Sequence, residues 1–212
     1  GSGTRMHVKD RPKQFLLVHG KPIIVHTIET FQNHPQIDGI IVVCIQDWIP
    51  YMEEMKYRYR LEKIISIVPG GNTGQLSIYN GLLEAKERCG TSETIVLIHD
   101  GVRPLIDADT ISRNIKCVKE NGVAITCSEV RETVVLIADN NSVADIPSRQ
   151  NSRIAKAPQS FWLKDILQIH QKALADGITN SIDSCTLMMH YNQKMTIVNG
   201  SSDNIKITTP DD

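Results

Sequence analysis

The sequence lacks an excess of charge of either sign, because its 23 basic residues nearly balance its 24 acidic residues. Net charge therefore gives no support to a nucleic-acid partner, and we expect none. The chain has no recognisable signal peptide and no apolar run of transmembrane length. We therefore expect no membrane partner and a cytoplasmic location. The five cysteines form no Cys-x-x-Cys pair, which argues against a disulfide framework and against a structural zinc site.

Short apolar runs and helical apolar patterns alternate along most of the chain. We predict strands at 39–45, 64–68, 94–98, 123–127 and 195–198. We predict helices at 22–31, 48–58, 76–89, 110–119, 163–175 and 183–190. Such alternation indicates an α/β fold with a doubly wound, mostly parallel sheet. A length of 212 residues fits one domain.

The alternation ends after residue 127. Two apolar segments at 133–137 and 142–146 are joined through the polar turn 139–141. This pattern predicts a β-hairpin, and the residues alone favour a hairpin on the surface.

The apolar run 95–98 ends at His99-Asp100 and then turns through Gly101 towards Arg103. Ligands of parallel sheets bind outside the carboxyl ends of the strands. A carboxylate and a guanidinium at that edge can together hold a metal ion and an anion. Equally, Asp100 can cap a turn and pair with Arg103, and the residues alone leave both interpretations open.

The first residues of the chain, Gly1-Ser-Gly-Thr-Arg-Met6, are followed by Lys13. Glycines allow backbone amides to approach a phosphate closely, and Arg5 and Lys13 add positive charge. A solvated surface loop is the alternative for such a basic run. The glycines favour anion binding.

Six ordered segments carry a resemblance to a known family: Gly1–Met6, Pro12–Phe15, Gly70-Gly71 with Ser77, His99–Pro104, Ala157–Phe161 and Asp203–Pro210. The set resembles the cytidylyltransferases that act on sugar-alcohol phosphates, over nearly the whole chain. The resemblance implies a Rossmann-like nucleotidyltransferase fold. It also implies that CMP is transferred from CTP to a polyol phosphate, with Mg²⁺ as the cofactor and pyrophosphate as the second product.

The resemblance also implies roles for individual residues. The catalytic cations are expected to be Arg5, Lys13 and Lys206. Nucleotide binding is expected from Gly1, Gly3, Thr4, Gly70, Gly71, Ser77 and Asp100. Binding of the polyol phosphate is expected from Arg103, Thr133, Arg149 and Lys206. Residues 129–155 would form an arm that carries part of this second site and joins two copies of the chain in a homodimer.

Asp100 is the leading expected metal ligand, because Mg²⁺ binds carboxylates together with phosphate oxygens. The resemblance implies Asp183 as a second metal ligand, because it matches an aspartate on a later helix of the family. Asp183 also lies where a helix is predicted to begin, so it is equally suited to be a helix N-cap. Both roles remain open for this residue.

The sequence departs from the family pattern at Gly74, where the family usually has an arginine that helps to order the nucleotide loop. Within the family, Gly101-Val102 and the segment Asp145–Arg149 favour the ribitol-5-phosphate branch over the methylerythritol-phosphate branch. Gly74 also leaves open a non-catalytic nucleotide-binding relative. A Rossmann dehydrogenase is disfavoured, because the glycine loop lacks the full Gly-x-Gly-x-x-Gly pattern.

Overall fold

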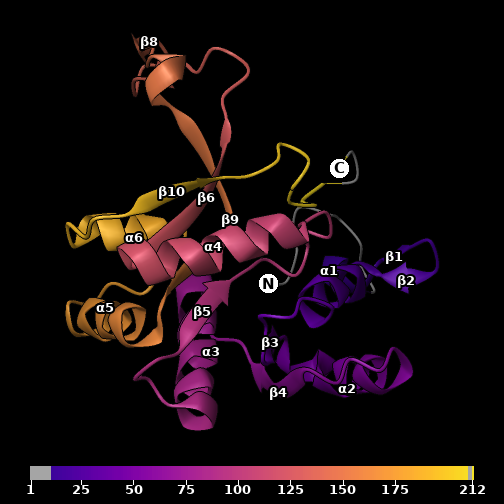
Figure 1. The fold of residues 1–212 in the computed structure, drawn as a ribbon. Coiled ribbons are helices and arrows are strands. Elements are labelled where there is room, and N and C mark those ends of the chain that lie inside the picture. The colour runs from indigo at the N-terminus through magenta and orange to yellow at the C-terminus, as the bar shows by residue number, and fades with distance from the viewer. Residues whose placement is uncertain (1–10, 210–211) are drawn as a thin grey trace.

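The computed structural model describes residues 11–209 and 212 (Figure 1). Its α-helices are α1 (Ile23–Gln32), α2 (Ile49–Arg58), α3 (Gly74–Cys89), α4 (Ala108–Asn121), α5 (Leu163–Ala175) and α6 (Ser184–His190). Its strands are β1 (Leu17–Val18), β2 (Lys21–Pro22), β3 (Ile40–Cys44), β4 (Ile64–Pro69), β5 (Ile95–Ile98), β6 (Val123–Glu129), β7 (Leu136–Ile137), β8 (Val143–Asp145), β9 (Arg153–Trp162) and β10 (Thr196–Asn199). Each strand and helix predicted from the alternating pattern is present with similar bounds.

The main sheet has the strand order β10-β6-β9-β5, and β3 pairs separately with β4. The pairs β3–β4 and β6–β10 are parallel, as predicted. Strand β9 runs antiparallel to both of its neighbours, β5 and β6. The fold is therefore the expected α/β fold, but its sheet is mixed.

The sequence did not predict β9, which lies in the middle of the main sheet. Pro158 falls inside this strand, and proline is rarely found in a central strand because it cannot donate a ladder hydrogen bond. The Ala157–Pro158 peptide is cis, and the β6–β9 register shifts between Ile125 and Cys127. The pairing is therefore irregular where the proline sits.

Helices cover both faces of the main sheet (Figure 1). Alternate residues of β6 face opposite sides, as strand geometry requires. Val123, Ile125 and Cys127 pack with Leu82 of α3 and with α5, whereas Ala124 packs beneath α4. Gly122, at a φ of +84°, ends α4 and turns the chain into β6.

A buried polar network fixes α4 to the sheet. Asn114 donates to the hydroxyl of Thr126 at 2.9 Å and accepts from the Ser160 hydroxyl at 2.8 Å. The Thr126 hydroxyl in turn donates to the carbonyl of Pro158 at 2.6 Å. The network joins α4, β6 and β9, and it holds β9 in register beside Pro158.

The predicted hairpin is present as β7 and β8, which pair antiparallel. It stands at the end of an arm that projects away from the helices and the sheet (Figure 1). Both strands are shorter than predicted. The ends of β6 and β9 form the base of the arm, where Glu129 of β6 stands opposite Arg153 of β9 in the strand pairing. None of the helices within residues 11–209 is long and apolar enough to span a membrane.

Candidate active site

The carboxyl end of β5 brings together a carboxylate and two cations. Arg103 donates from Nε to Asp100 Oδ2 at 2.8 Å, and Lys206 donates from Nζ to Asp100 Oδ1 at 2.8 Å. Lys206 lies 106 positions further along the chain. The Asp100–Arg103 pair that the sequence left open therefore forms, and it forms within a larger charged cluster.

Lys13 belongs to the same region of the molecule. Its ammonium donates to the carbonyl of Ile207 at 2.9 Å, one residue after Lys206. The amide of Ile207 donates to the carbonyl of Val102 at 2.9 Å. Two of the three expected catalytic cations, Lys13 and Lys206, thus converge on the turn that follows β5.

The charge of Asp100 is stabilised by its neighbours. Burial acts to raise its pKa, but the charges and hydrogen bonds of Lys206 and Arg103 outweigh burial and lower the pKa to about 2. The side chain is 33% exposed, so it is accessible from solvent. Asp100 is therefore an ionised and reachable carboxylate at neutral pH.

His99 behaves as a structural residue. Burial lowers its pKa to about 4, and its Nε2 donates to the carbonyl of Arg103 at 3.3 Å. Its ring lies 5.0 Å from the ring of Phe31. A neutral imidazole in this position orients the turn that carries Asp100 and Arg103.

The glycine turn between β4 and α3 is tightly closed. The amide of Gly71 donates to the Ser77 hydroxyl at 3.0 Å, and that hydroxyl donates to the carbonyl of Thr73 at 2.9 Å. A Cβ at position 71 would lie 2.5 Å from Cβ of Leu76, so only glycine fits there. Gly70, Gly71 and Ser77 thus form one compact turn at the start of α3.

Asp183 is the N-cap of α6. Its side chain accepts from the amide of Thr186 at 2.9 Å and from Gln159 Nε2 at 3.2 Å. Gln159 stands opposite Ile98 of β5, two residues before Asp100. The capping role that the sequence left open is therefore present, and it places Asp183 at the same edge of the sheet as Asp100.

No group of three or more histidine, cysteine, aspartate or glutamate side chains is placed to hold a metal ion within the part of the chain that the structure describes. Asp100 has the donor chemistry for Mg²⁺, which typically binds one or two carboxylates and completes its shell with phosphate oxygens and water. The oxygens of Asp183 are engaged by the start of α6. Both oxygens of Asp100 are likewise engaged, by Arg103 and Lys206, so either carboxylate would have to give up a hydrogen bond to hold the ion.

Thr133 and Arg149 lie on the exposed arm, apart from the charged cluster. Arg149 donates to the carbonyl of Arg131 at 3.3 Å, and Arg131 donates to the Ser202 hydroxyl at 2.8 Å. The base of the arm is therefore in contact with the segment that carries Lys206. The expected residues Gly1, Gly3, Thr4 and Arg5 lie outside the described residues.

Several residues of this region were not predicted from the sequence. Lys156 of β9 donates to the carbonyls of Ser202 and Asn204, and Asn204 donates to the carbonyl of Ala157 at 2.6 Å. Gln75 of α3 bonds the backbone of Ile178 and Ser181, just before Asp183. These contacts use backbone groups, so no residue pattern reveals them; only the position of Asn204 within the segment Asp203–Pro210 was a signal.

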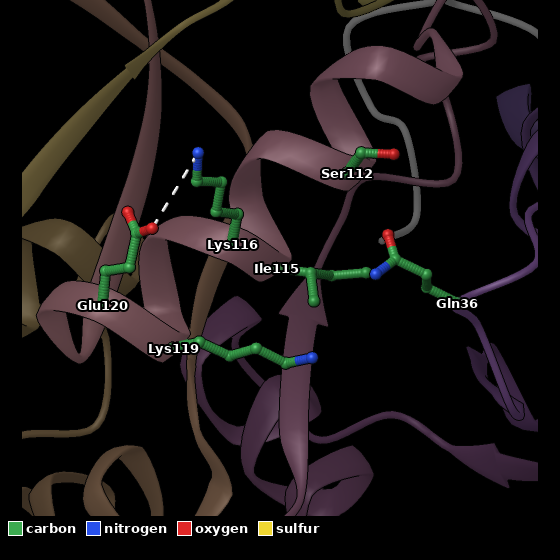
Figure 2. Close-up of a pocket in the computed structure, with 6 residues that line it drawn as sticks. All are labelled: Gln36, Ser112, Ile115, Lys116, Lys119 and Glu120. Carbon is green, nitrogen blue, oxygen red and sulfur yellow. Dashed lines mark ion pairs between the residues drawn. The ribbon is translucent and has the colours of Figure 1, made fainter.

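Two surface cavities lie away from the charged cluster at the end of β5. One, of 390 Å³, is lined by Gln36 and by α4 side chains, among which Lys116 faces Glu120 at 3.9 Å (Figure 2). The second, of 340 Å³, lies between the base of the arm and β10, lined by Gln150, Asn151, Arg153, Ile197 and Asn199. Of the expected site residues within the described part of the chain, none lines either cavity.

Comparison with known proteins identifies the family. The model of the 2-C-methyl-D-erythritol 4-phosphate cytidylyltransferase family matches residues 1–212. A ribitol-5-phosphate cytidylyltransferase of Streptococcus agalactiae serotype III is 55% identical, covering 100% of this chain and 88% of that protein. A 2-C-methyl-D-erythritol 4-phosphate cytidylyltransferase of Clostridium acetobutylicum is 38% identical, covering 100% of this chain and 90% of the relative.

The fold agrees with this assignment. The crystal structure of 4-diphosphocytidyl-2C-methyl-D-erythritol synthase from Anaerococcus prevotii superposes with a TM-score of 0.82 at 28% identity. The superposition covers 92% of this chain and 84% of that one. The chain therefore belongs to the 2-C-methyl-D-erythritol 4-phosphate cytidylyltransferase family.

Proposed function

We propose that the protein transfers CMP from CTP to ribitol 5-phosphate and releases pyrophosphate. The observation that carries the proposal is the cluster at the carboxyl end of β5, where Arg103 and Lys206 pair with Asp100 and Lys13 bonds the carbonyl of Ile207, next to Lys206. Cations and a carboxylate at this edge suit a reaction between two phosphate-bearing anions.

In the proposed reaction a phosphate oxygen of the polyol attacks the α-phosphorus of CTP. The bond from that phosphorus to the bridging oxygen breaks, and pyrophosphate leaves with its electron pair. Both reactants are anionic, so fixed cations must offset their repulsion and the charge of the transition state. Lys13 and Lys206 supply such charge, and Arg5 is assigned to the same role by resemblance.

Asp100 would hold Mg²⁺, and the ion, when bound, neutralises charge on the nucleotide phosphates. The low pKa of Asp100 keeps this carboxylate ionised at neutral pH. Lys206 donates a hydrogen bond to one oxygen of Asp100. The ammonium of Lys206 can leave this oxygen to meet a phosphate, because Arg103 still holds the other oxygen of Asp100.

The glycine turn is the proposed site of the cytosine and ribose. Gly70, Gly71 and Ser77 present backbone groups and a hydroxyl, which can distinguish a pyrimidine from a purine by hydrogen-bond pattern and size. A Cβ at Gly74 would meet no heavy atom within 4 Å. The position that usually carries arginine in the family is therefore open in this chain.

The arm, residues 129–155, is the proposed dimerisation element and the carrier of Thr133 and Arg149 for the polyol phosphate. Its apolar side chains are unusually exposed, including Ile137 at 69% and Val143 at 63%. A second copy of the chain that covers them would bury this apolar surface. A planar guanidinium such as that of Arg149 suits a phosphate ligand.

Ribitol 5-phosphate is the favoured acceptor because the S. agalactiae relative is 55% identical, against 38% for the C. acetobutylicum relative. The segments Gly101-Val102 and Asp145–Arg149 favour the same branch. Methylerythritol 4-phosphate is the second candidate, because the matching family model and the superposed structure bear that name.

The test is pyrophosphate release from CTP and Mg²⁺, with ribitol 5-phosphate and methylerythritol 4-phosphate offered in parallel. The proposal predicts release that depends on ribitol 5-phosphate, with a kcat/KM at least about tenfold above that of the other acceptor, a difference of about 1.4 kcal/mol. Preference for methylerythritol 4-phosphate would reverse the branch, and no release with either acceptor would refute both.

A further inference from the structure

The segment that carries Lys206 is held by side chains and not by regular secondary structure. Residues 201–209 follow β10 and form neither helix nor strand. Lysine has a long, mobile side chain, so the position of its ammonium depends on how well its backbone is fixed. The contacts that fix this backbone therefore control where Lys206 can reach.

Lys156 is central among these contacts. Its ammonium donates to the carbonyl of Ser202 at 3.0 Å and to the carbonyl of Asn204 at 3.1 Å. The carbonyl of Asn204 also accepts from Arg103 Nη1 at 2.8 Å. One backbone carbonyl, two residues before Lys206, thus receives hydrogen bonds from two cations, and such charge-assisted bonds are stronger than neutral ones.

Lys156 also stands between the two halves of the proposed site. It lies on β9, the strand that returns from the arm to the main sheet. Ser202, whose carbonyl it binds, accepts from Arg131 at the base of the arm through its hydroxyl. On the other side, Arg103 joins Asn204 to Asp100. Lys156 consequently connects the arm to the segment that carries Lys206.

The ammonium of Lys156 is part-buried, and it donates hydrogen bonds to two neutral carbonyls. Burial and the nearby charge of Arg103 lower its pKa, while Asp203 acts in the opposite direction. A cation kept under these conditions has a cost in desolvation, which its two hydrogen bonds offset. The ammonium of Lys156 is therefore held in a more defined position than that of an ordinary surface lysine.

We propose that Lys156 is a positioning residue, which holds the segment 201–207 so that the Lys206 ammonium lies at the reacting phosphates. The proposal rests on the proposed cytidylyl transfer for its kinetic readout. Lys156 itself touches no reacting atom in this account and acts through Lys206.

The principal variant is Lys156→Met, which keeps the length of the stem and removes the donors. It should lower kcat by roughly 10- to 100-fold, as expected when a catalytic group is misplaced, and leave the KM for CTP within about threefold. Lys156→Arg, which keeps a charged donor, should recover most of the loss. Lys119→Met, at an exposed lysine of α4, is the matched control and should behave as wild type.

A double variant separates positioning from direct catalysis. If Lys156 acts through Lys206, adding Lys156→Met to Lys206→Met should lower kcat less than twofold further. Multiplication of the two single effects would overturn the proposal, because it would mean that Lys156 contributes to the reaction independently.

Amide hydrogen exchange gives a readout that requires no turnover. In the ligand-free full chain, Lys156→Met should speed exchange at Ile207, whose amide is bonded to Val102, at least about tenfold. Unchanged exchange there would overturn the proposal even if activity fell. If wild-type protein turns over no polyol phosphate, the proposed function fails. The exchange measurement still tests whether Lys156 fixes the segment 201–207. If Lys156→Met does not fold, Lys156→Gln takes its place in the same comparisons.

Discussion

Asp100 forms two ion pairs that differ in their exposure to solvent. Its two oxygens are each bonded to a cation, Arg103 on one side and Lys206 on the other. Arg103 is almost fully buried and is also bonded to Asn204, whereas Lys206 is 42% exposed. The Arg103 contact is therefore the permanent one, and the Lys206 contact is the one that ligands can exchange.

Replacement of Lys206 by methionine should lower kcat by about 10²–10³, because a preorganised charge at the transition state is lost. Steady-state kinetics of pyrophosphate release measures this. The melting temperature should change by only a few degrees, because an exposed ion pair contributes about 1 kcal/mol or less to stability. Near wild-type turnover would remove Lys206 from the catalytic assignment.

His170 of α5 gives a prediction about acid stability. Its side chain is 1% exposed, neither ring nitrogen has a hydrogen-bond partner among residues 11–209 and 212, and burial lowers its pKa to about 4. The unfolded chain binds a proton near pH 6.5 and the folded chain only near pH 4, so acidification through this window favours unfolding. Stability from this residue is thus complete above pH 6.5 and is lost towards pH 4.

The variant His170→Leu should remove that part of the acid dependence, which is on the order of 2–3 kcal/mol. Denaturant unfolding of wild type and variant at pH 7 and at pH 4.5 measures the difference. His26→Leu, at a partly exposed histidine of α1, is the control. An equal pH dependence in wild type and His170→Leu would contradict the assignment.

At the scale of the elements, the sequence revealed helices and parallel strands well. The bounds of α5 match the prediction, because an apolar face repeats over its whole length. Strand β9 was missed because Pro158 breaks its pattern, and its place is set by contacts distant in sequence, such as the hydrogen bond of Thr126 to Pro158. Tertiary packing overrides the local signal here.

The residues of the candidate site also fall into two groups, those that sequence motifs predicted and those that only the fold revealed. Asp100, Arg103 and Lys206 were named from motifs, and the fold brings them together. Lys156 and Gln75 escaped notice because they bond backbone carbonyls and amides, whose positions only the fold determines. The catalytic, metal-binding and substrate-binding roles of all these residues, and of Thr133, Arg149 and Asp183, stay predictions.

The open position at Gly74 predicts a gain of function at the start of α3. Since a Cβ there meets nothing within 4 Å, Gly74→Arg should fold normally. An added guanidinium beside the glycine turn should tighten CTP binding by roughly threefold to tenfold, or about 1 kcal/mol. Calorimetric titration with CTP measures this.

Gly71→Ala tests the same turn in the opposite direction. Its Cβ would meet Leu76 at 2.5 Å, so the turn must shift and CTP should bind more weakly. Unchanged affinity in both variants would place the nucleotide elsewhere in the molecule.

For the whole molecule, the arm predicts the oligomeric state. Ile137 is 69% exposed and belongs to β7 of the hairpin. The hairpin stands at the end of the arm, away from the main sheet (Figure 1). Ile137→Asp would place a charge in the proposed contact between two copies, at a cost of several kcal/mol if the site is buried there.

Sedimentation velocity should show a dimer for wild type and a shift towards monomer for Ile137→Asp. Tyr57→Asp, at an 89% exposed aromatic of α2, is the control and should leave the dimer intact. A monomeric wild type, or a dimer that Ile137→Asp does not disturb, would contradict the proposed role of the arm.

The account as a whole is tested most directly by following CTP and ribitol 5-phosphate with Mg²⁺ by ³¹P NMR, with wild type and Lys206→Met side by side. We predict that wild type produces pyrophosphate and a diphosphate diester in equal amounts, and that Lys206→Met produces neither on the same timescale. Pyrophosphate without the diester, or equal product from both proteins, would contradict the proposal that this cluster transfers CMP to the polyol phosphate.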